Sequence, residues 1–355
     1  MPKPATKSLN VFMVAIPETA GSALYGMKDV LMATGNIWQT LTRDDNQQCP
    51  FAVNIVSYSR QGFQCGNGIP ILPDIDFHES DVTADIVILP ELWLGPDEPL
   101  TGRYPELINW LKMQHANGAY IYSACSGAIM LAETGLLDEC DATSHWGYQD
   151  LFRKHYPRVR FKPEPNLVIA DPAGKIVTAG GTTSWHDLAI YIISKHFSPA
   201  EAVRIAQVYL LKWHDEGQLP YHSLLTNNPH SDHLVAECEA ALKTHYKNRN
   251  ALQLTLEQAN IPERTLKRRF KTATGSTLID YLQNIRIEAA KRQLEQTQLA
   301  VDDISFDIGY EDASFFRRLF KRRTGLTPSQ YRRMFKPIIQ SAAQPRPEGN
   351  VLSDT

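Results

Sequence analysis

The chain has 355 residues, of which 43% are hydrophobic, and a formal net charge of −3. This length predicts two domains rather than one, each with enough apolar residues for a packed core. The absence of any apolar run of about 18 residues speaks against a membrane-spanning helix, and the first ten residues lack the apolar segment of a signal peptide. The five cysteines form no CxxC pair, which argues against a disulfide framework or a zinc site. We therefore expect a cytoplasmic protein with reduced thiols, no metal and no cofactor.

The small net charge conceals an asymmetry between two parts of the chain. Residues 249–336 hold 17 Lys and Arg against 10 Asp and Glu, whereas the rest holds 19 basic and 29 acidic residues. A basic block beside an acidic body indicates that only one part meets a polyanion such as DNA.

Strand and helix signals alternate through the first 200 residues. Apolar, β-branched runs predict strands at 9–16, 51–59, 84–90, 119–125 and twice within 166–181. Helical spacing of apolar residues predicts helices at 22–33, 104–118, 126–133 and 184–197. Continuous apolar strands between helices predict an α/β domain of flavodoxin-like type, with a mostly parallel sheet covered by helices on both faces.

Small residues surround Cys125, where the strand at 119–125 meets the following helix. The segment reads SACSGA over 123–128, and a tight strand-to-helix turn requires such small neighbours. The N-terminus of the following helix would favour the thiolate of Cys125. His145, twenty residues later, is a candidate base.

Strand signals end at Pro199, and the rest of the chain predicts helices. We expect the first domain to span 1–214, a polar, turn-rich linker to span 215–232, and an all-α domain to span 233–336. The remaining residues, 337–355, have the composition of a disordered tail.

The all-α region contains an internal repeat with a spacing of 50 residues. The segment KRRFKTATGSTLIDY (267–281) aligns with RRLFKRRTGLTPSQY (317–331), with Arg, Phe, Lys, Thr, Gly and Tyr in common. In each copy a short helix, a turn at 259–260 or 309–310 and a second helix follow one another, which predicts a helix-turn-helix. The domain is therefore expected to carry two such units.

The second helix of each copy has an apolar face and a cationic face. Leu266 and Phe270, and correspondingly Phe316 and Phe320, share the face predicted to be core. Residues on the other face are candidates for reading the DNA major groove: Arg264, Thr265, Lys267, Arg268 and Lys271 in the first copy, and Ser314, Arg318, Lys321 and Arg322 in the second. A long helix between the copies would place both reading helices about 34 Å apart, on one side of a duplex. The alternative is a solvated basic face on an ordinary helical bundle.

Residues 249–335 resemble the AraC/XylS-type DNA-binding domain, most closely at DIGYEDASFFRRLFKRRTGLTPSQYRRMF. The resemblance implies a monomer unit that carries both reading helices and activates transcription beside RNA polymerase.

The first domain resembles the ThiJ/PfpI branch of the class I glutamine amidotransferase-like superfamily, at SACSGAIMLAETGLLD, ATSHW and AGGTTSWHDLAIYII. The whole chain is similar to regulators of the GlxA type, in which this domain precedes an AraC-type domain. Cys125 and His145 match the elbow cysteine and downstream histidine of enzymatic relatives. Those relatives have a glycine pair after the third strand, whereas Pro90 and Glu91 stand here, and a carboxylate would oppose an oxyanion. Both Cys125 and His145 are therefore predicted to be vestigial, and the chain to be no enzyme.

The resemblance implies that the pocket binds a small nitrogenous metabolite such as an amino acid or betaine. Aromatic rings and carboxylates suit such a cation, so the candidate effector residues are Glu18, Glu91, Trp93, Cys125, Ser126, His145, Trp146 and Trp185. The leading hypothesis is a homodimeric, DNA-binding transcriptional activator that responds to this metabolite. Two alternatives remain: a cysteine hydrolase or hydratase fused to a DNA-binding domain, and a redox sensor that acts through Cys125.

Overall fold

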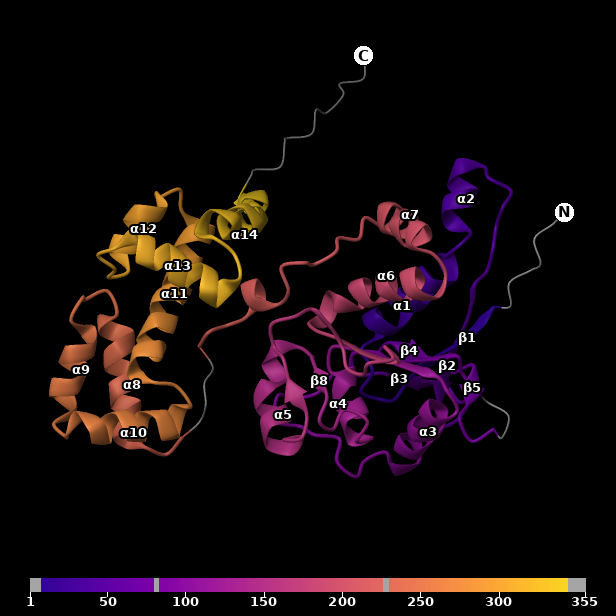
Figure 1. The fold of residues 1–355 in the computed structure, drawn as a ribbon, viewed down its shortest axis with the longest axis horizontal. Coiled ribbons are helices and arrows are strands. Elements are labelled where there is room, and N and C mark those ends of the chain that lie inside the picture. The colour runs from indigo at the N-terminus through magenta and orange to yellow at the C-terminus, as the bar shows by residue number, and fades with distance from the viewer. Residues whose placement is uncertain (1–7, 80–82, 226–229, 344–355) are drawn as a thin grey trace, which may run out of the picture. The chain divides into compact units, whose positions relative to one another are not determined.

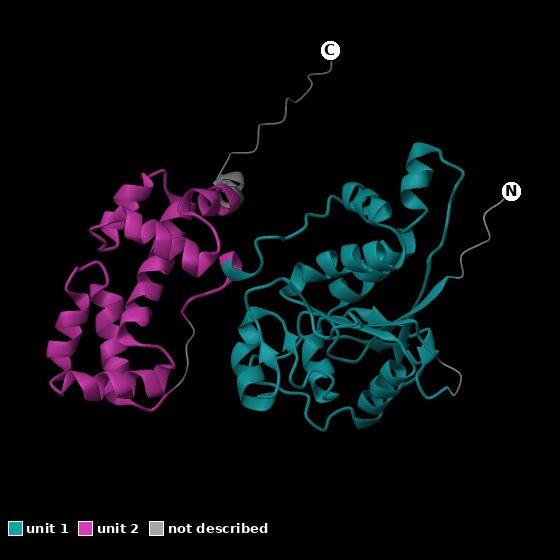
Figure 2. Cartoon of the chain, viewed as in Figure 1, with its two compact units in different colours: residues 1–219 teal, residues 220–355 magenta. Residues whose placement is uncertain are grey.

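The computed structural model describes residues 8–79, 83–225 and 230–343. The chain divides into two units, residues 1–219 and residues 220–355 (Figure 2). Each unit has its own hydrophobic cores.

The first unit is built on a seven-stranded sheet with the order β10-β11-β7-β6-β1-β2-β5. Figure 1 labels β1, β2 and β5 of this sheet. The strands of this sheet are β1 (Leu9–Val14), β2 (Phe51–Ser57), β5 (Ile75–Asp76), β6 (Ile86–Leu89), β7 (Tyr120–Ala124), β10 (Leu167–Ile169) and β11 (Ile176–Ala179). Neighbouring strands pair in parallel except β10 and β11, which are antiparallel. The predicted mostly parallel sheet is thus confirmed.

Helices cover both faces of this sheet because side chains alternate along each buried strand. In β1, Val11 and Met13 belong to the core beneath α1 (Gly21–Ala33), α6 (Trp185–His196) and α7 (Pro199–Tyr209). Phe12 and Val14 belong to the opposite core, beneath α3 (Pro105–Ala116), α4 (Gly127–Glu133) and α5 (Gln149–His155).

Several short elements were not predicted because they carry too few apolar residues to show a period. They are α5, α2 (Ile37–Thr42), the antiparallel pair β3 (Phe63–Gln64) and β4 (Pro70–Ile71), the parallel pair β8 (Asp141–Ala142) and β9 (Arg160–Phe161), and the 3₁₀ turns η1 (Trp146–Tyr148), η2 (Thr182–Ser184) and η3 (Leu219–Tyr221). Two of these, η1 and η2, lie next to the pocket described below.

The second unit is helical and contains two cores along one long helix. Its helices are α8 (His233–His245), α9 (Ala251–Ala259), α10 (Glu263–Thr274), α11 (Leu278–Gln296), α12 (Val301–Asp307), α13 (Ala313–Thr324) and α14 (Pro328–Ala343). The first half of α11 packs with α8, α9 and α10, and the second half with α12, α13 and α14. None of the helices among the described residues is long and apolar enough to cross a membrane.

The tandem repeat is visible in the backbone as well as in the core. The turns between the paired helices contain Asn260 and Gly309, both with positive φ, at 48° and 92°. Both α10 and α13 end at a glycine in the left-handed region, Gly275 and Gly325, whose N–H donates to the carbonyl of the lysine four residues earlier. The expected pair of helix-turn-helix units is confirmed.

The C-terminal segment differs from the expectation of a disordered tail that begins at residue 337. Helix α14 continues past this position to Ala343. The rest of the expected tail, residues 344–355, lies outside the described residues.

The boundary between the units falls inside the segment 215–232, which we expected to be a linker. Both described flanks of this boundary are held by hydrogen bonds. On one side the Gln218 N–H donates to the Glu164 carbonyl at 2.8 Å. On the other side the Lys291 ammonium donates to the carbonyl of His222 at 2.8 Å.

Candidate effector pocket and nucleic-acid interface

Cys125 lies at the carboxyl end of β7, on the predicted strand-to-helix turn. Its φ is 52°, in the left-handed region that side chains rarely adopt, and its N–H donates to the Ala179 carbonyl at 3.0 Å. Gly127 shows why the neighbours must be small, since a Cβ there would lie 2.2 Å from the carbonyl oxygen of Leu89. The elbow geometry inferred from the small residues is therefore present.

A pocket of about 230 Å³ opens in front of Cys125. It is lined by Glu91, Leu94, Pro96, Cys125, His145, Gly147, Tyr148 and Thr182. Glu91, Cys125 and His145 were predicted to meet here, and the structure brings them together. Glu91 and Cys125 follow β6 and β7, two neighbouring parallel strands of the main sheet, so the carboxyl ends of these strands meet at the pocket, as in other open α/β sheets. His145 follows β8, which belongs to the separate pair of β8 and β9.

Glu91 and Cys125 form a buried pair in which neutral forms are favoured. Glu91 is 8% exposed and Cys125 is 2% exposed. The Cys125 thiol donates to Glu91 Oε1 at 3.7 Å, and the Thr182 hydroxyl donates to the same oxygen at 3.1 Å. Burial raises the pKa of Glu91, and burial, with the Glu91 carboxylate as a second cause, raises the pKa of Cys125 to about 12.

These shifts overturn the expectation that the following helix favours a thiolate. Helix α4 has only 7 residues, and the low dielectric around the sulfur outweighs whatever its N-terminus contributes. A thiol with a pKa near 12 is a poor nucleophile at neutral pH. The carboxyl group of Glu91 also lies next to the Cys125 sulfur, where its negative form would oppose a developing oxyanion.

His145 is held as a turn cap. Its Nδ1 accepts a hydrogen bond from the Gly147 N–H at 3.0 Å, at the start of η1. Burial lowers the pKa of His145, which favours the neutral ring. Among the described residues, no hydrogen bond joins His145 to Cys125. The geometry thus provides a wall of the pocket rather than a base paired with the sulfur.

Five of the predicted effector residues do not line this pocket. The Glu18 carboxylate forms an ion pair with Arg103 and accepts a hydrogen bond from the Tyr104 hydroxyl at 2.5 Å. The Ser126 hydroxyl is buried, where it donates to the Leu92 carbonyl at 2.5 Å and accepts from the Leu92 N–H at 2.7 Å. Both side chains are committed to neighbouring segments.

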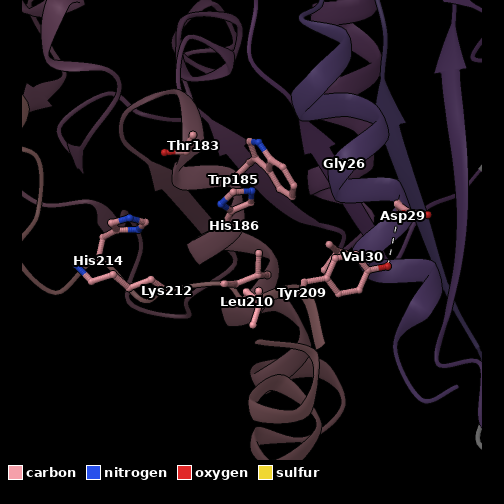
Figure 3. Close-up of a pocket in the computed structure, with 11 residues that line it drawn as sticks. Gly26, Asp29, Val30, Thr183, Trp185, His186, Tyr209, Leu210, Lys212 and His214 are labelled. Atoms are coloured by element: carbon pink, nitrogen blue, oxygen red, sulfur yellow. Dashed lines mark hydrogen bonds between the residues drawn. The ribbon is translucent and has the colours of Figure 1, made fainter. Parts of the chain in front are cut away.

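The three tryptophans are also placed elsewhere. Trp93 is 64% exposed, because the buried Leu92 before it directs Trp93 outward. The Trp146 ring lies against the His145 ring, with centroids 4.9 Å apart, and is not among the residues that line the pocket. Trp185 lines a different cavity of about 530 Å³, with Gly26, Asp29, His186 and Tyr209 among its neighbours (Figure 3).

Sequence reasoning missed four side chains that line the Cys125 pocket: Leu94, Pro96, Tyr148 and Thr182. Tyr148 donates from its hydroxyl to the Leu94 carbonyl at 2.9 Å, which ties η1 to the segment after β6. Thr182 stands in GGTTSW (180–185), directly after β11, where the carboxyl ends of the parallel strands meet. That position is the signal by which Thr182 could have been found.

In the second unit, α10 and α13 present the predicted faces. Leu266, Phe270, Phe316 and Phe320 are fully buried. The candidate DNA-reading residues lie on the outer faces: Arg264, Lys267, Arg268, Lys271, Ser314, Arg318, Lys321 and Arg322 are exposed, and Thr265 is half-buried. The cationic faces are therefore open to solvent within the unit.

Some cations of α10 and α13 are held in ion pairs, whereas most of the candidate DNA-reading cations have no partner among the described residues. Arg269 donates two hydrogen bonds to Asp232, at 2.7 and 3.0 Å, and Arg323 donates to Asp280 at 2.5 Å. Lys267 forms an ion pair with Glu263 one turn away. For the other candidate cations, Arg264, Arg268, Lys271, Arg318, Lys321 and Arg322, the described residues provide no hydrogen-bond or ion-pair partner. Their charges remain available to an external polyanion.

Helix α11 fixes the separation of the two reading helices. Its 19 residues correspond to a length of about 28 Å. Since α10 packs at one half of α11 and α13 at the other, the two reading helices lie at different positions along α11; the expected match to one turn of B-form DNA, about 34 Å, stays a prediction.

The fold and its two surfaces define a class of protein: a doubly wound α/β domain with a cysteine elbow, followed by a tandem helix-turn-helix domain. Comparison with known families agrees in both parts, since the DJ-1/PfpI family matches residues 35–195 and a helix-turn-helix domain family matches residues 256–334.

Relatives with both parts are similar over most of the chain. The HTH-type transcriptional regulator CdhR of Pseudomonas aeruginosa is 30% identical over 264 residues, which cover 70% of this chain and 73% of CdhR. The HTH-type transcriptional regulator GlxA of Rhizobium meliloti is 28% identical over 221 residues, 61% of this chain and 66% of GlxA. The solved structure of DJ-1beta from Drosophila melanogaster aligns with a TM-score of 0.47 and 18% identity, over 58% of this chain and all of that one. The chain belongs to the family of HTH-type transcriptional regulators that join an N-terminal DJ-1/PfpI domain to a C-terminal AraC-type domain.

Proposed function

We propose that the chain binds a specific DNA site through both helix-turn-helix units and activates transcription in response to a small nitrogenous metabolite. The observation that carries the DNA-binding part is the pair of outer faces on α10 and α13, which pack against the two halves of α11. These faces carry six exposed cations that have no ion-pair partner among the described residues. Arginine at such positions reads guanine edges, and lysine neutralises phosphate. In this proposal Arg264, Thr265, Lys267, Arg268 and Lys271 contact one major groove, and Ser314, Arg318, Lys321 and Arg322 contact the next.

Charge reversal tests this interface. A duplex is first selected from a random library with the wild-type protein, and its affinity for Arg268→Glu and Arg318→Glu is then measured by gel shift. Each reversal should abolish specific binding and leave the melting temperature unchanged, because both guanidinium groups are exposed and unpaired. Lys243→Glu is the matched control, an exposed reversal on α8, which is not a reading helix. Wild-type affinity in both arginine variants would refute the interface.

The effector part of the proposal places an amino acid or betaine in the Cys125 pocket. Glu91 is the carboxylic acid among the lining residues, and burial raises its pKa, which favours the protonated form. A cationic ligand next to Glu91 would favour the carboxylate, so binding would release a proton. Tyr148 supplies an aromatic face in the same pocket.

A thermal-shift screen of the common amino acids, glycine betaine and carnitine tests this assignment, because a ligand of the folded state raises the melting temperature. Calorimetry of a hit in two buffers of different ionisation enthalpy measures the proton release. A hit that binds Glu91→Gln with unchanged affinity and the same proton release would contradict binding at Glu91.

The proposal includes a homodimer in the cytoplasm that contacts RNA polymerase. A dimer would offer four reading helices to a tandem or inverted site, and sedimentation at micromolar concentration measures its presence. We propose no catalytic or redox function for Cys125, because its raised pKa opposes both nucleophilic attack and oxidation.

A further inference from the structure

Gln218, next to the boundary between the units, is buried inside the first unit. The next residue, Leu219, is the last of that unit, yet the Gln218 side chain is only 3% exposed. Gly180 makes room for it, since a Cβ at Gly180 would lie 2.3 Å from Gln218 Nε2. A polar side chain at the exit of a domain is usually in water, so its burial calls for a reason.

The Gln218 amide holds the segment that forms one wall of the Cys125 pocket. Its Nε2 donates to the carbonyl of Ser144 at 2.9 Å, to the Thr143 hydroxyl at 3.1 Å and to the carbonyl of Pro165 at 3.2 Å. Its Oε1 accepts from the Trp146 N–H at 3.2 Å. Two of these partners, Ser144 and Trp146, stand on either side of the pocket residue His145.

The same wall segment is attached to the elbow. The Ser144 hydroxyl donates to the Cys125 carbonyl at 2.7 Å, and the His145 ring faces the pocket. Residues 144–146 therefore touch the Cys125 pocket on one side and Gln218 on the other. A ligand that displaces His145 must strain the hydrogen bonds between Gln218 and this segment.

On the other side of Gln218 the chain soon reaches α11. After the three residues of η3, the His222 carbonyl accepts from Lys291 at 2.8 Å, the Leu224 N–H donates to Glu288 at 3.0 Å, and the Leu224 carbonyl accepts from Asn284 at 3.1 Å. Lys291, Glu288 and Asn284 all belong to α11, the helix that separates the two reading helices.

We infer that Gln218 is a positioning residue that couples the Cys125 pocket to the DNA-binding unit. It fastens the chain to the 144–146 wall at one end of η3, and α11 fastens the chain at the other end. A movement of the wall reaches α11 through three residues. This inference rests on the proposed function, in that the Cys125 pocket is taken as the effector site.

The chemistry of the site selects an amide. One end of the side chain directs its two N–H bonds at three oxygens within 3.2 Å, and the other end accepts from a backbone N–H. Glutamate would direct a carboxylate oxygen at the carbonyls of Ser144 and Pro165, and asparagine is one methylene too short. Alanine would leave these partners unsatisfied.

A double-mutant cycle in the full-length protein tests the coupling without knowledge of the ligand. The probe is the duplex selected with the wild-type protein, and its Kd is measured by fluorescence anisotropy. His145→Ala perturbs the pocket wall, Gln218→Ala removes the coupling residue, and Gln61→Ala is an exposed control in the same unit. We expect His145→Ala to change the Kd by at least about threefold in the wild-type and Gln61→Ala backgrounds, and by less than about twofold in the Gln218→Ala background.

The other outcomes are distinct. If His145→Ala changes the Kd equally in the Gln218→Ala background, the coupling inference is overturned and the effector site stands. If His145→Ala leaves the Kd unchanged in every background, the pocket does not affect DNA binding. That result overturns both the coupling inference and the assignment of the pocket as the effector site. Should Gln218→Ala fail to fold, the isosteric Gln218→Glu takes its place in the cycle. Hydrogen exchange at the Trp146 amide gives a second readout, and it should quicken in either Gln218 variant while the β7 amides stay protected.

Discussion

Arg286 on α11 offers a sharp test of how the two helix-turn-helix units are held together. Its guanidinium is buried, with Nε donating to the Tyr246 carbonyl at 2.8 Å and Nη2 to the Asn248 carbonyl at 2.9 Å. The same group lies 5.1 Å from the ring centroid of Tyr310. Tyr246 and Asn248 precede the first helix-turn-helix, and Tyr310 lies in the turn of the second, so Arg286 bridges the two.

The expected cost of Arg286→Met follows from these contacts. Each hydrogen bond from a charged donor contributes about 1.5–3 kcal/mol, and part of the loss is offset because methionine is easier to bury than a guanidinium. We expect a net loss of about 3 kcal/mol, and a fall in melting temperature of roughly 10 °C. Arg286→Lys keeps the charge and can satisfy one carbonyl, so its loss should be about half.

The assay uses the distribution of tryptophan. All 6 tryptophans lie in the first unit and none in the second. Tryptophan fluorescence therefore reports on the first unit, whereas far-ultraviolet circular dichroism also includes the helical second unit. In urea, Arg286→Met should shift the dichroism transition and leave the fluorescence transition in place. Arg292→Met, an exposed change on the same helix, is the control, and a difference from it below about 0.5 kcal/mol would refute the bridge.

Three further predictions concern the pocket, the cores and the DNA-facing surface. Burial raises the pKa of Glu91 from about 4.5, so the folded state binds the Glu91 proton more tightly than the unfolded state does, and stability falls as pH rises from 4.5 through the raised pKa. When the free energy of unfolding is measured by denaturation across this range, Glu91→Gln should flatten its slope against pH. An unchanged slope would contradict the raised pKa of Glu91. Phe270→Ala and Phe320→Ala each empty a fully buried site in a different core and should cost about 3–5 kcal/mol, with exchange protection lost mainly in the half of the unit that is mutated. Lys271→Ala and Lys321→Ala should each reduce the slope of log affinity against log salt by about 1, and an unaltered slope would remove that lysine from the phosphate contacts.

The parts of the fold that sequence predicts well are those in which neighbours along the chain decide the outcome. Leu266 and Phe270 are four residues apart on a helix, so their shared face follows from the helical period alone. The small residues after Ser123 likewise predict the elbow, because the constraint acts within three or four residues. In these cases the local backbone geometry alone determines which face is buried or which turn forms.

For the predicted effector residues that do not line the Cys125 pocket, the position of the side chain is decided by partners or turns that the local sequence does not reveal. Glu18 is taken up by Arg103 and Tyr104, 85 and 86 positions later, and nothing near Glu18 announces this. Trp185 stands three residues after the pocket residue Thr182, yet the intervening 3₁₀ turn directs it to another cavity. Proximity in sequence at the end of a strand does not determine which side of a turn faces the pocket.

The Cys125 elbow keeps its backbone geometry although the surroundings of its sulfur oppose a thiolate. The positive φ of Cys125 and the close approach at Gly127 keep the turn in place, while Glu91 and burial hold the sulfur as a thiol. Burial raises the pKa of the Glu91 carboxyl group and lowers that of the His145 imidazole, so the protonation of both groups depends on what surrounds them. In the proposed function, a cationic ligand would favour the carboxylate of Glu91 and would press on the wall held by Gln218. The burial that opposes a Cys125 thiolate would then also make the protonation of Glu91 sensitive to the charge of a ligand.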